Sequence, residues 1–595
     1  MTDTEIAKQK PFEIALVLAG AVACGSYIAG FLDHFLDTLD AWEEAKKSGH
    51  PDVPQHQLKI KVIAGASAGG MSAAIFIREA FRRAKLRREG QPVNSEDSLL
   101  KKAWVESIDI SDLLKNKDLK EGSVVQSLLD CTRIDEVANE ILCDGSNFPE
   151  WENIPFFDAE IKAYLTLTNL KGLSYKLRFT SDTNSGHQFI NHADYEYFEF
   201  SEGVFNSSKK DWNNEWKKLK DRAIATGAFP IALKPREING RSYDFYKNRL
   251  KEEGRGLAEH LDVNKDGDFS FYAIDGGTIN NEPFDLAKSV WAIVNENDEF
   301  QNLGKFTLGE NCVIMVDPFP GEGILETHPK GSRWFYSFIP DLISTLLNQS
   351  RFRVEEIREW SQMEEGTRFL VMPRKEENGQ LSTKPLKGGF LGGFGGFFNK
   401  KFREHDYELG RANCQSFLEK YFILPLSVAE HSSVIDTANI KKINSGNIEN
   451  HVAIIYSRPN GQSLPNELTG ETAKKKETSA QITSNEFEGI VNNMGKRLHA
   501  ILNHLPIPFR ILFHPISIFL PIAYLALVVF NLIFNCFELP LAGELINIIL
   551  IPMMIGLLIG GLTYKVIPDI LLRYIARGLK KSMEEWEVME KSNKV

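Results

Sequence analysis

Two strand-like runs, each followed by a glycine-rich turn and a helix-like run, constrain the fold of this chain most strongly. The first joins the apolar run 13–19 to a helical periodicity from Gly25 onward, and the second joins 58–64 to a helical run from Ala68. Short apolar runs that alternate with helices are typical of sheets whose faces are covered by helices. We therefore expect an α/β fold.

Charge and cysteine content exclude some classes of function. The chain of 595 residues has a formal charge of −11, whereas nucleic-acid binding needs clustered lysines and arginines, so we expect no nucleic-acid partner. Six cysteines without a C-x-x-C pair indicate neither a zinc site nor a disulfide framework. We expect no metal, no cofactor and a reducing compartment. The uncharged run 14–32 imitates an export signal, although glycines interrupt it.

The turn between the second strand and its helix holds the candidate nucleophile. Ser67 stands between Gly65 and Gly69 in a G-x-S-x-G pattern. At a strand-to-helix turn such a serine has a strained backbone that exposes its hydroxyl, and small neighbours let the turn close. A purely structural turn is the alternative.

Asp275 is the candidate general base. It ends an apolar strand-like run and enters the Gly276-Gly277 turn, so we expect its carboxylate at the edge of the sheet where the Ser67 turn opens. An aspartate that bonds its own turn backbone is the alternative. The segment from Asp262 begins like a calcium loop, but Ala273 stands where the loop needs glutamate, which favours a polar turn.

The turn after the first strand is the candidate oxyanion hole. Small residues there expose backbone N–H groups, which can stabilise an oxyanion by roughly 3–4 kcal/mol per donor. A phosphate-binding loop is the alternative, but neither nucleotide-binding glycine pattern is present. The residues of this loop are Gly20, Ala21, Val22, Ala23, Cys24 and Gly25.

These three pieces, in this order, resemble the patatin-like phospholipase family, and segment 225–235 is similar to another segment of it. The glycine- and phenylalanine-rich segment 386–414 resembles the longer bacterial patatin-related proteins. The resemblance implies a three-layer sheet with helices on both faces and a Ser67-Asp275 dyad that works without histidine. The usual loop is G-G-G-x-R-G. Here Ala21 and Val22 replace glycines and Cys24 replaces arginine, which leaves open the effect on headgroup binding.

A serine-acid-histidine triad remains the alternative catalytic arrangement. Downstream histidines that could complete it are His328, His405, His431 and His451. His405 fits best by position, but its charged neighbours favour a salt-bridged surface or a structural network.

Two apolar runs near the C-terminus, 511–537 and 545–564, contain no charged residue and are long enough to cross a bilayer. We expect a transmembrane helical hairpin, with core helices of a soluble domain as the alternative. Basic residues flank the two runs on their outer sides, so we expect both ends of the hairpin to lie in the cytoplasm. The protein would then be a multi-pass protein of the inner membrane. Gly556 and Gly560 form a G-x-x-x-G pattern, which permits close packing within the hairpin or in a homo-oligomer.

The expected activity is that of a membrane-anchored serine lipid acyl hydrolase that cleaves carboxylic ester bonds of bilayer phospholipids. The alternative is a membrane-tethered scaffold or channel-like protein with an inactive hydrolase domain. The expected divisions are a catalytic core at 12–290, its extension at 291–457, a polar linker at 458–486, a juxtamembrane helix at 487–510, the hairpin at 511–564 and a cytoplasmic tail at 565–595.

Overall fold

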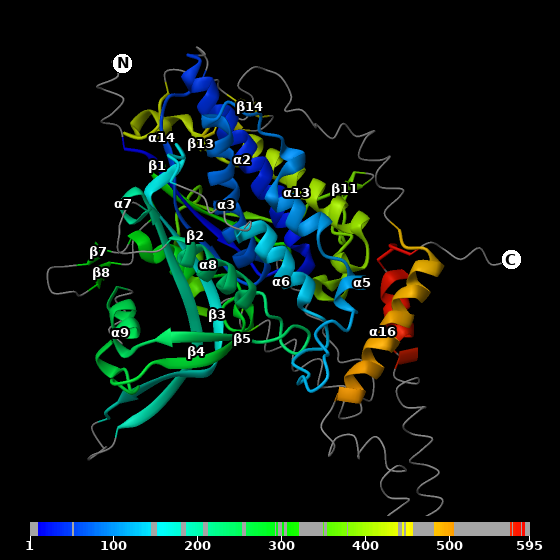
Figure 1. Ribbon diagram of the computed structural model, residues 1–595. Helices are drawn as coiled ribbons and strands as arrows, with labels where there is room; N and C mark the ends of the chain where they lie inside the picture. Colours follow the sequence, from blue (N-terminus) through cyan, green and yellow to red (C-terminus); the bar gives the residue numbers. More distant parts are fainter. Residues whose placement is uncertain are drawn as a thin grey trace, which may run out of the picture. The chain divides into compact units, whose positions relative to one another are not determined.

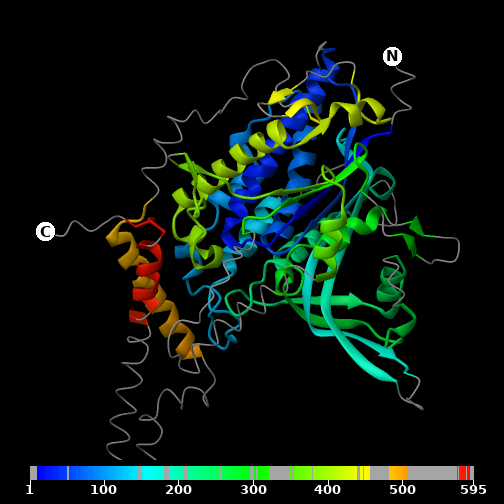
Figure 2. The same cartoon turned by 180° about the vertical axis from the view of Figure 1, so that it is seen from behind.

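The computed structural model divides into two compact units, and Figures 1 and 2 show their elements from opposite sides. The first unit comprises Met1–Asp109 and Arg133–Ala480, and the second comprises Ile110–Thr132 and Gln481–Val595. The predicted core and extension, 12–290 and 291–457, remain predictions. The structure describes residues 10–49, 53–143, 151–179, 186–205, 212–252, 258–291, 293–294, 300–302, 306–319, 349, 351, 354–377, 379–437, 443–445, 448–455, 481–504, 572–573, 575–584 and 586–589.

An eight-stranded mixed sheet forms the centre of the first unit. Its strands are β1 (Phe12–Leu18), β2 (Leu58–Gly65), β3 (Phe157–Leu177), β4 (His187–Ser201), β5 (Arg236–Arg241), β6 (Phe269–Asp275), β9 (Asn311–Val316) and β10 (Arg368–Val371). Their order is β10-β9-β1-β2-β3-β6-β5, with β4 paired to β3. Neighbours from β10 to β3 are parallel, whereas β4 and β6 run antiparallel to β3, and β5 runs antiparallel to β6. The α/β fold is therefore confirmed, with a mixed sheet.

Strand β1 shows why the sheet needs a layer of helices on each face. Ile14, Leu16 and Leu18 belong to one apolar core, and the alternate residues Ala15 and Val17 belong to a second. Successive side chains of a strand point to opposite faces, so an uninterrupted apolar run buries both. Each fully buried leucine or isoleucine contributes about 1.5–3 kcal/mol.

Helices complete both cores. The larger core receives side chains from α2 (Gly25–Lys47), α3 (Ala68–Arg88), α8 (Trp212–Thr226) and α13 (Lys400–Lys420), and the smaller one from α10 (Phe284–Lys288) and α12 (Val354–Gln362). The remaining elements are η1 (Val22–Cys24), η2 (Ser95–Asp97), α4 (Leu99–Lys101), η3 (Lys102–Glu106), α5 (Ile110–Leu113), α6 (Thr132–Ala138), η4 (Asn139–Cys143), α7 (Glu202–Phe205), α9 (Tyr243–Glu252), η5 (Ala258–His260), η6 (Gly276–Thr278), η7 (Ser289–Trp291), β7 (Ile293–Val294), β8 (Phe300–Asn302), β11 (Glu376–Glu377), β12 (Gln380–Leu381), η9 (Phe390–Phe398), β13 (Ile423–Pro425), α14 (Leu426–His431), β14 (Ile443–Ser445), β15 (Ile448–Ala453) and α16 (Ser484–His504).

Helices α2 and α13 pack at backbone distance although they are far apart in sequence. A Cβ atom on Gly30 would lie 1.9 Å from the Tyr407 carbonyl oxygen, and one on Gly410 would lie 2.1 Å from the Tyr27 carbonyl oxygen. The Tyr407 hydroxyl also donates to Asp33 Oδ2 at 2.9 Å. Only glycine permits this approach, so α13 is fixed against the helix that follows the predicted oxyanion loop.

The second unit joins α16 to residues 110–132. Arg497 of α16 is buried, forms an ion pair with Asp118, and donates to the carbonyl oxygens of Lys115 and Leu128 at 2.9 and 3.0 Å. Among the described residues, no helix has the length and apolar character needed to span a bilayer. The predicted hairpin at 511–564 lies outside the described residues.

Candidate active site

Ser67 occupies a sharp turn between β2 and α3. Its φ of 50° and ψ of −124° place a non-glycine residue in a strained conformation, which costs about 1–3 kcal/mol. A Cβ atom on Gly69 would lie 2.1 Å from the Leu18 carbonyl oxygen, and one on Gly65 would lie 2.6 Å from the Gly70 nitrogen. Both glycines of the G-x-S-x-G pattern are therefore needed for the turn to close.

The backbone of Ser67 is also held from a different element. Its N–H donates to the Thr226 hydroxyl at 2.9 Å, and Thr226 is the last residue of α8 and fully buried. The position of the serine is thus fixed by α8 as well as by its own turn.

Asp275 reaches Ser67 from strand β6, which runs antiparallel to β3. The Ser67 hydroxyl donates to Asp275 Oδ2 at 2.5 Å, and the Gly277 N–H donates to Oδ1 at 2.7 Å. The Asp275 carbonyl oxygen accepts from the Thr168 hydroxyl at 2.9 Å, and its N–H donates to the Ala228 carbonyl oxygen at 2.9 Å. Four partners therefore fix this residue.

The side chain of Asp275 is buried. Burial raises its pKa to about 7, although the hydrogen bonds from Ser67 and Gly277 act to lower the pKa. Gly276 and Gly277 form the turn behind it. A Cβ atom on Gly276 would lie 2.2 Å from the Thr166 carbonyl oxygen, so the turn cannot accept a larger residue without moving. The carboxyl can accept a proton from Ser67 near neutral pH.

The predicted oxyanion loop passes directly beside Ser67. A Cβ atom on Gly20 would lie 3.1 Å from Ser67 Cβ and 2.2 Å from Asn281 Oδ1. The Gly20 N–H donates to the Asn281 carbonyl oxygen at 3.3 Å. The loop is thereby tied to the segment that follows Asp275.

The rest of this loop forms a short helical turn into α2. Val22, a β-branched residue, has a φ of 50°, a conformation that costs about 1–3 kcal/mol and is concentrated at functional sites. The Cys24 N–H donates to the Ala21 carbonyl oxygen at 2.9 Å, and Ala23 and Cys24 are buried. Burial raises the pKa of the Cys24 thiol, and the charge of Asp406 adds to this effect. Gly25 begins α2, where a Cβ atom would lie 2.5 Å from the Trp104 ring.

Comparison with known proteins gives a family for the part of the chain that carries this site. Residues 16–288, which contain Ser67 and Asp275, match the family described as patatin-like phospholipase. These residues form a patatin-like phospholipase domain.

Two further likenesses extend beyond that domain. An uncharacterized protein of Sinorhizobium fredii, y4iI, is 28% identical to this chain over an alignment of 566 residues, and the match covers 83% of this chain and 76% of that protein. The crystal structure of VipD from Legionella pneumophila matches 69% of this chain and 67% of that chain, with 11% identity and a TM-score of 0.24.

A mainly apolar pocket opens at Ser67 and Asp275 of the patatin-like domain. Besides these two residues, Lys234 and Arg236 are the charged or hydroxyl-bearing side chains among its described lining residues. The apolar and glycine lining comes from Val22, Ala68, Met71, Trp104, Ile108, Ile134, Ile224, Gly227, Ala228, Phe229, Leu233, Phe394 and Phe397. A site of this composition suits the hydrocarbon part of a lipid next to an ester group.

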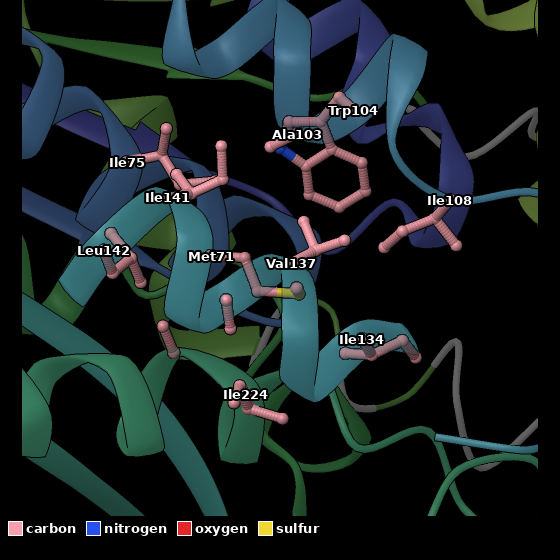
Figure 3. A pocket seen from close by; sticks show the side chains of 12 residues that line it. Met71, Ile75, Ala103, Trp104, Ile108, Ile134, Val137, Ile141, Leu142 and Ile224 are labelled. Atoms are coloured by element: carbon pink, nitrogen blue, oxygen red, sulfur yellow. The ribbon is translucent and has the colours of Figure 1, made fainter. Parts of the chain in front are cut away.

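An adjoining cavity lengthens the apolar space, and Figure 3 shows the side chains around it. Both cavities share the lining residues Met71, Trp104, Ile108, Ile134 and Ile224. The farther cavity adds Ile75, Ala103, Val137, Ala138, Ile141, Leu142 and Ala223, none of which carries a polar side chain.

The aromatic wall of the pocket includes residues from outside the matched range 16–288. Phe394 and Phe397 belong to η9, and the Phe394 ring packs edge-to-face against Phe229 with 5.1 Å between centroids. Gly393 has a φ of +94°, and a Cβ atom on it would lie 2.9 Å from the Ala21 carbonyl oxygen. The sequence marks this segment as glycine- and phenylalanine-rich and as similar to longer bacterial patatin-related proteins, but neither feature predicts its position at the pocket.

Helix α13 anchors η9 from behind. The Asp406 carboxylate accepts from the Lys387 and Gly388 N–H groups at 2.7 and 2.8 Å. Arg403 donates to the Gly396 carbonyl oxygen at 2.8 Å. The wall of the pocket is therefore held by the same helix that packs against α2.

Among the described residues, no hydrogen bond joins a histidine to Ser67, as the alternative triad would require. His405 Nδ1 lies 3.0 Å from Asp406 Oδ1, and His431 Nδ1 lies 2.7 Å from the Ser427 carbonyl oxygen. No histidine is among the described residues that line the Ser67 pocket, and His328 lies outside the described residues. No group of three or more described His, Cys, Asp or Glu side chains could hold a metal ion.

Proposed function

We propose that this chain is a serine lipid acyl hydrolase that cleaves carboxylic ester bonds of phospholipids. One observation carries the proposal: within a patatin-like phospholipase domain, the hydroxyl of the strained Ser67 lies 2.5 Å from the buried Asp275 carboxylate at the mouth of an apolar pocket. A short contact between nucleophile and base is what covalent catalysis requires.

In the proposed first step, Ser67 Oγ bonds to the ester carbonyl carbon while its proton passes to Asp275 Oδ2. The carbonyl π electrons move to oxygen. The Ala68 N–H and the N–H groups of the Gly20–Gly25 loop other than those of Gly20, Cys24 and Gly25, which bond backbone carbonyl oxygens, stabilise the resulting charge. The carbon–oxygen bond to the leaving alcohol then breaks as Asp275 returns the proton to that alcohol. An acyl group remains on Ser67.

In the second step, water replaces the hydroxyl of Ser67 as the nucleophile. Asp275 accepts a proton from the water, the acyl–Ser67 bond breaks, and the proton returns to Ser67 Oγ, which releases a carboxylic acid. A base with a pKa near the working pH performs both transfers, and burial places the pKa of Asp275 at about 7.

The shape and charge of the pocket support a phospholipid substrate. The two adjoining cavities offer apolar walls for an acyl chain. Lys234 and Arg236 add positive charge beside the reacting groups, and both also form ion pairs with Asp135, at 3.2 and 2.7 Å. A phosphate near the ester would be attracted to this pair of cations.

We further propose that the runs 511–537 and 545–564 anchor the enzyme in a membrane, with the catalytic domain on the cytoplasmic side of a bacterial inner membrane. The support is their length, their lack of charge, and the basic residues outside them. An alkaline wash should leave the full chain in the membrane fraction. A chain that ends after His504 keeps α16 and the Arg497–Asp118 pair, so it should be released and still cleave a dispersed butyrate ester.

The activity is tested by release of fatty acid from vesicles by the purified full-length protein. We expect release by the wild-type chain and by Ser72→Ala, a control that removes another buried serine hydroxyl from α3. Ser67→Ala and Asp275→Asn should lose activity by orders of magnitude while keeping the circular dichroism spectrum of the wild type. A folded wild-type protein that releases nothing would favour the inactive scaffold instead.

A further inference from the structure

The hairpin of β3 and β4 extends beyond the edge of the sheet that carries the active site. Strand β3 runs parallel to β2 and pairs Leu165 with Gly65, just before Ser67, and Leu167 with Asp275. Strand β3 then continues to Leu177, and at about 3.3 Å per residue this continuation is roughly 30 Å long at most. Figures 1 and 2 both show these two strands extending past the rest of the sheet.

We define the distal hairpin as residues 170–179 and 186–192. Near the sheet, one of its faces is covered, because Leu173 and Tyr175 pack with Tyr246, Leu250 and Leu261 around α9. The register places Phe189 opposite Tyr175 and His187 opposite Leu177. The covered face therefore continues toward the tip as an aromatic surface.

That aromatic surface is open to solvent. Phe179 is 51% exposed and Phe189 is 43% exposed. Their rings lie 6.4 Å apart, and the His187 ring lies 6.2 Å from Phe179 and 6.0 Å from Phe189. Ile190, 59% exposed, pairs with Ser174 and therefore adds apolar surface to the opposite face of the hairpin, and Leu170 is 50% exposed. Large apolar side chains clustered in this way mark an interaction surface.

The charge of the distal hairpin is opposite to that of the whole chain. Its described residues include the exposed cations Lys171, Lys176 and Arg178 and no aspartate or glutamate, and the connecting segment 180–185 contributes one acid, Asp182, to the sequence. The whole chain has a formal charge of −11. Lys176 pairs with Gln188, so its side chain lies on the face opposite Phe189. Aromatic rings on one face and a cation on the other suit end-on contact of the hairpin with the headgroup region of an anionic bilayer, whereas two such hairpins would repel each other.

We propose that the distal hairpin docks on an anionic lipid surface and turns the Ser67 edge of the sheet toward the bilayer. This inference rests on the proposed lipid hydrolase function, because it supplies the means by which that site reaches lipid. Apolar rings would enter the interface while Lys176 and Arg178 contact lipid phosphates.

A probe on the hairpin tests the docking directly. The five described native cysteines are buried, so in a full-length Cys536→Ser background a fluorophore that responds to polarity can be attached at Phe189→Cys. Leu381→Cys on β12, 67% exposed in the same unit, is the matched control. The labelled proteins are reconstituted in vesicles of phosphatidylcholine alone or of equimolar phosphatidylcholine and phosphatidylglycerol.

We expect the Phe189 probe to shift to shorter wavelengths and to be quenched by spin-labelled lipid in the vesicles that contain phosphatidylglycerol, while the Leu381 probe stays in water. A hairpin probe that stays in water in both vesicles, or that responds only to protein concentration, would overturn the assignment to lipid. Equal responses with and without phosphatidylglycerol would overturn the role of the cations.

Hydrolysis separates this inference from the proposed function. Phe179→Ser combined with Phe189→Ser, or Lys176→Gln combined with Arg178→Gln, should raise KM for vesicle phospholipid roughly tenfold and leave hydrolysis of a dispersed butyrate ester unchanged. Leu381→Ser should change neither. Variants that match Leu381→Ser on vesicles would refute the docking role, whereas a wild-type protein inactive on butyrate would refute the proposed function itself.

Discussion

The pH dependence of ester hydrolysis should report the ionisation of Asp275. Burial raises the pKa of this carboxyl from 3.8 to about 7, and only its ionised form can accept the Ser67 proton. Near pH 5, about two units below that pKa, about 1% of the protein carries the ionised form, so kcat/KM should be about 100-fold below its plateau. A carboxyl with the ordinary pKa would still be about 94% ionised there.

The assay is the initial rate of butyrate ester hydrolysis from about pH 5 to about pH 9, measured at a wavelength where product absorbance does not depend on pH. Circular dichroism at each pH shows that the fold persists. A rate that stays at its plateau down to pH 5 would refute the assignment of a raised pKa to the base.

An imidazole base would also lose activity below neutral pH, so the identity of the titrating group needs a second measurement. The pKa of a carboxyl scarcely changes with temperature, whereas that of an imidazole falls on warming. We expect the inflection of the profile to stay in place between cold and warm conditions, and to be unchanged in His405→Ala. An inflection that moves with temperature would favour the histidine triad.

Four further predictions concern stability and chain-length preference. The folded-state pKa of Asp275 lies above its unfolded value, so the contribution of this carboxyl to stability is lost as pH rises through about 7. Asp275→Asn should therefore raise the melting midpoint more at high pH than at low pH. An equal change at both pH values would contradict this. Val137→Phe should fill the farther cavity and lower kcat/KM for long-chain esters about tenfold or more relative to butyrate, whereas equal losses on both esters would show that chains bind elsewhere. Gly69→Ala should prevent folding, because its Cβ atom would meet the Leu18 carbonyl oxygen at 2.1 Å, while Gly203→Ala, which would meet nothing within 4 Å, should be tolerated in the same thermal melt. Arg497→Ala removes the ion pair with the partly exposed Asp118 and leaves the carbonyl oxygens of Lys115 and Leu128 without this donor, at a cost of about 1–3 kcal/mol. Hydrogen exchange should therefore become faster in α16 and 110–132; unchanged protection would refute the role of Arg497.

The local part of this architecture could be predicted from the sequence because it depends on neighbouring residues. An apolar run followed by small residues and a helical periodicity was enough to predict the turn that holds Ser67. Gly65 and Gly69 are needed for the reason that the sequence pattern indicates, because each lies against backbone atoms that leave no room for a Cβ atom.

Contacts between distant segments could not be predicted in the same way. Asp275 was expected at the sheet edge near Ser67, but no periodicity showed that β6 would arrive antiparallel to β3. The bond from Ser67 to Thr226 and the packing of Phe394 in the pocket depend on how α8 and η9 fold back across the sheet. Local propensity contains no information on these pairings, because each joins segments more than a hundred residues apart.

The hairpin that extends from the catalytic edge was also not predicted. The run from Ala163 to Gly172 indicates a strand, but its length past Leu167 follows from pairing with β4. That Phe179 and Phe189 are exposed to solvent could not be predicted, because it depends on how far α9 covers the hairpin.

The most direct test of the central claim is covalent labelling of the full-length protein with a fluorophosphonate, which reacts with a serine activated by a neighbouring base. Mass spectrometry of the digested protein should find the adduct on the peptide that contains Ser67. Labelling should be absent in Ser67→Ala, strongly slowed in Asp275→Asn, and unchanged in Ser72→Ala. A folded wild-type protein that stays unlabelled, or that carries the adduct on another serine, would contradict the account.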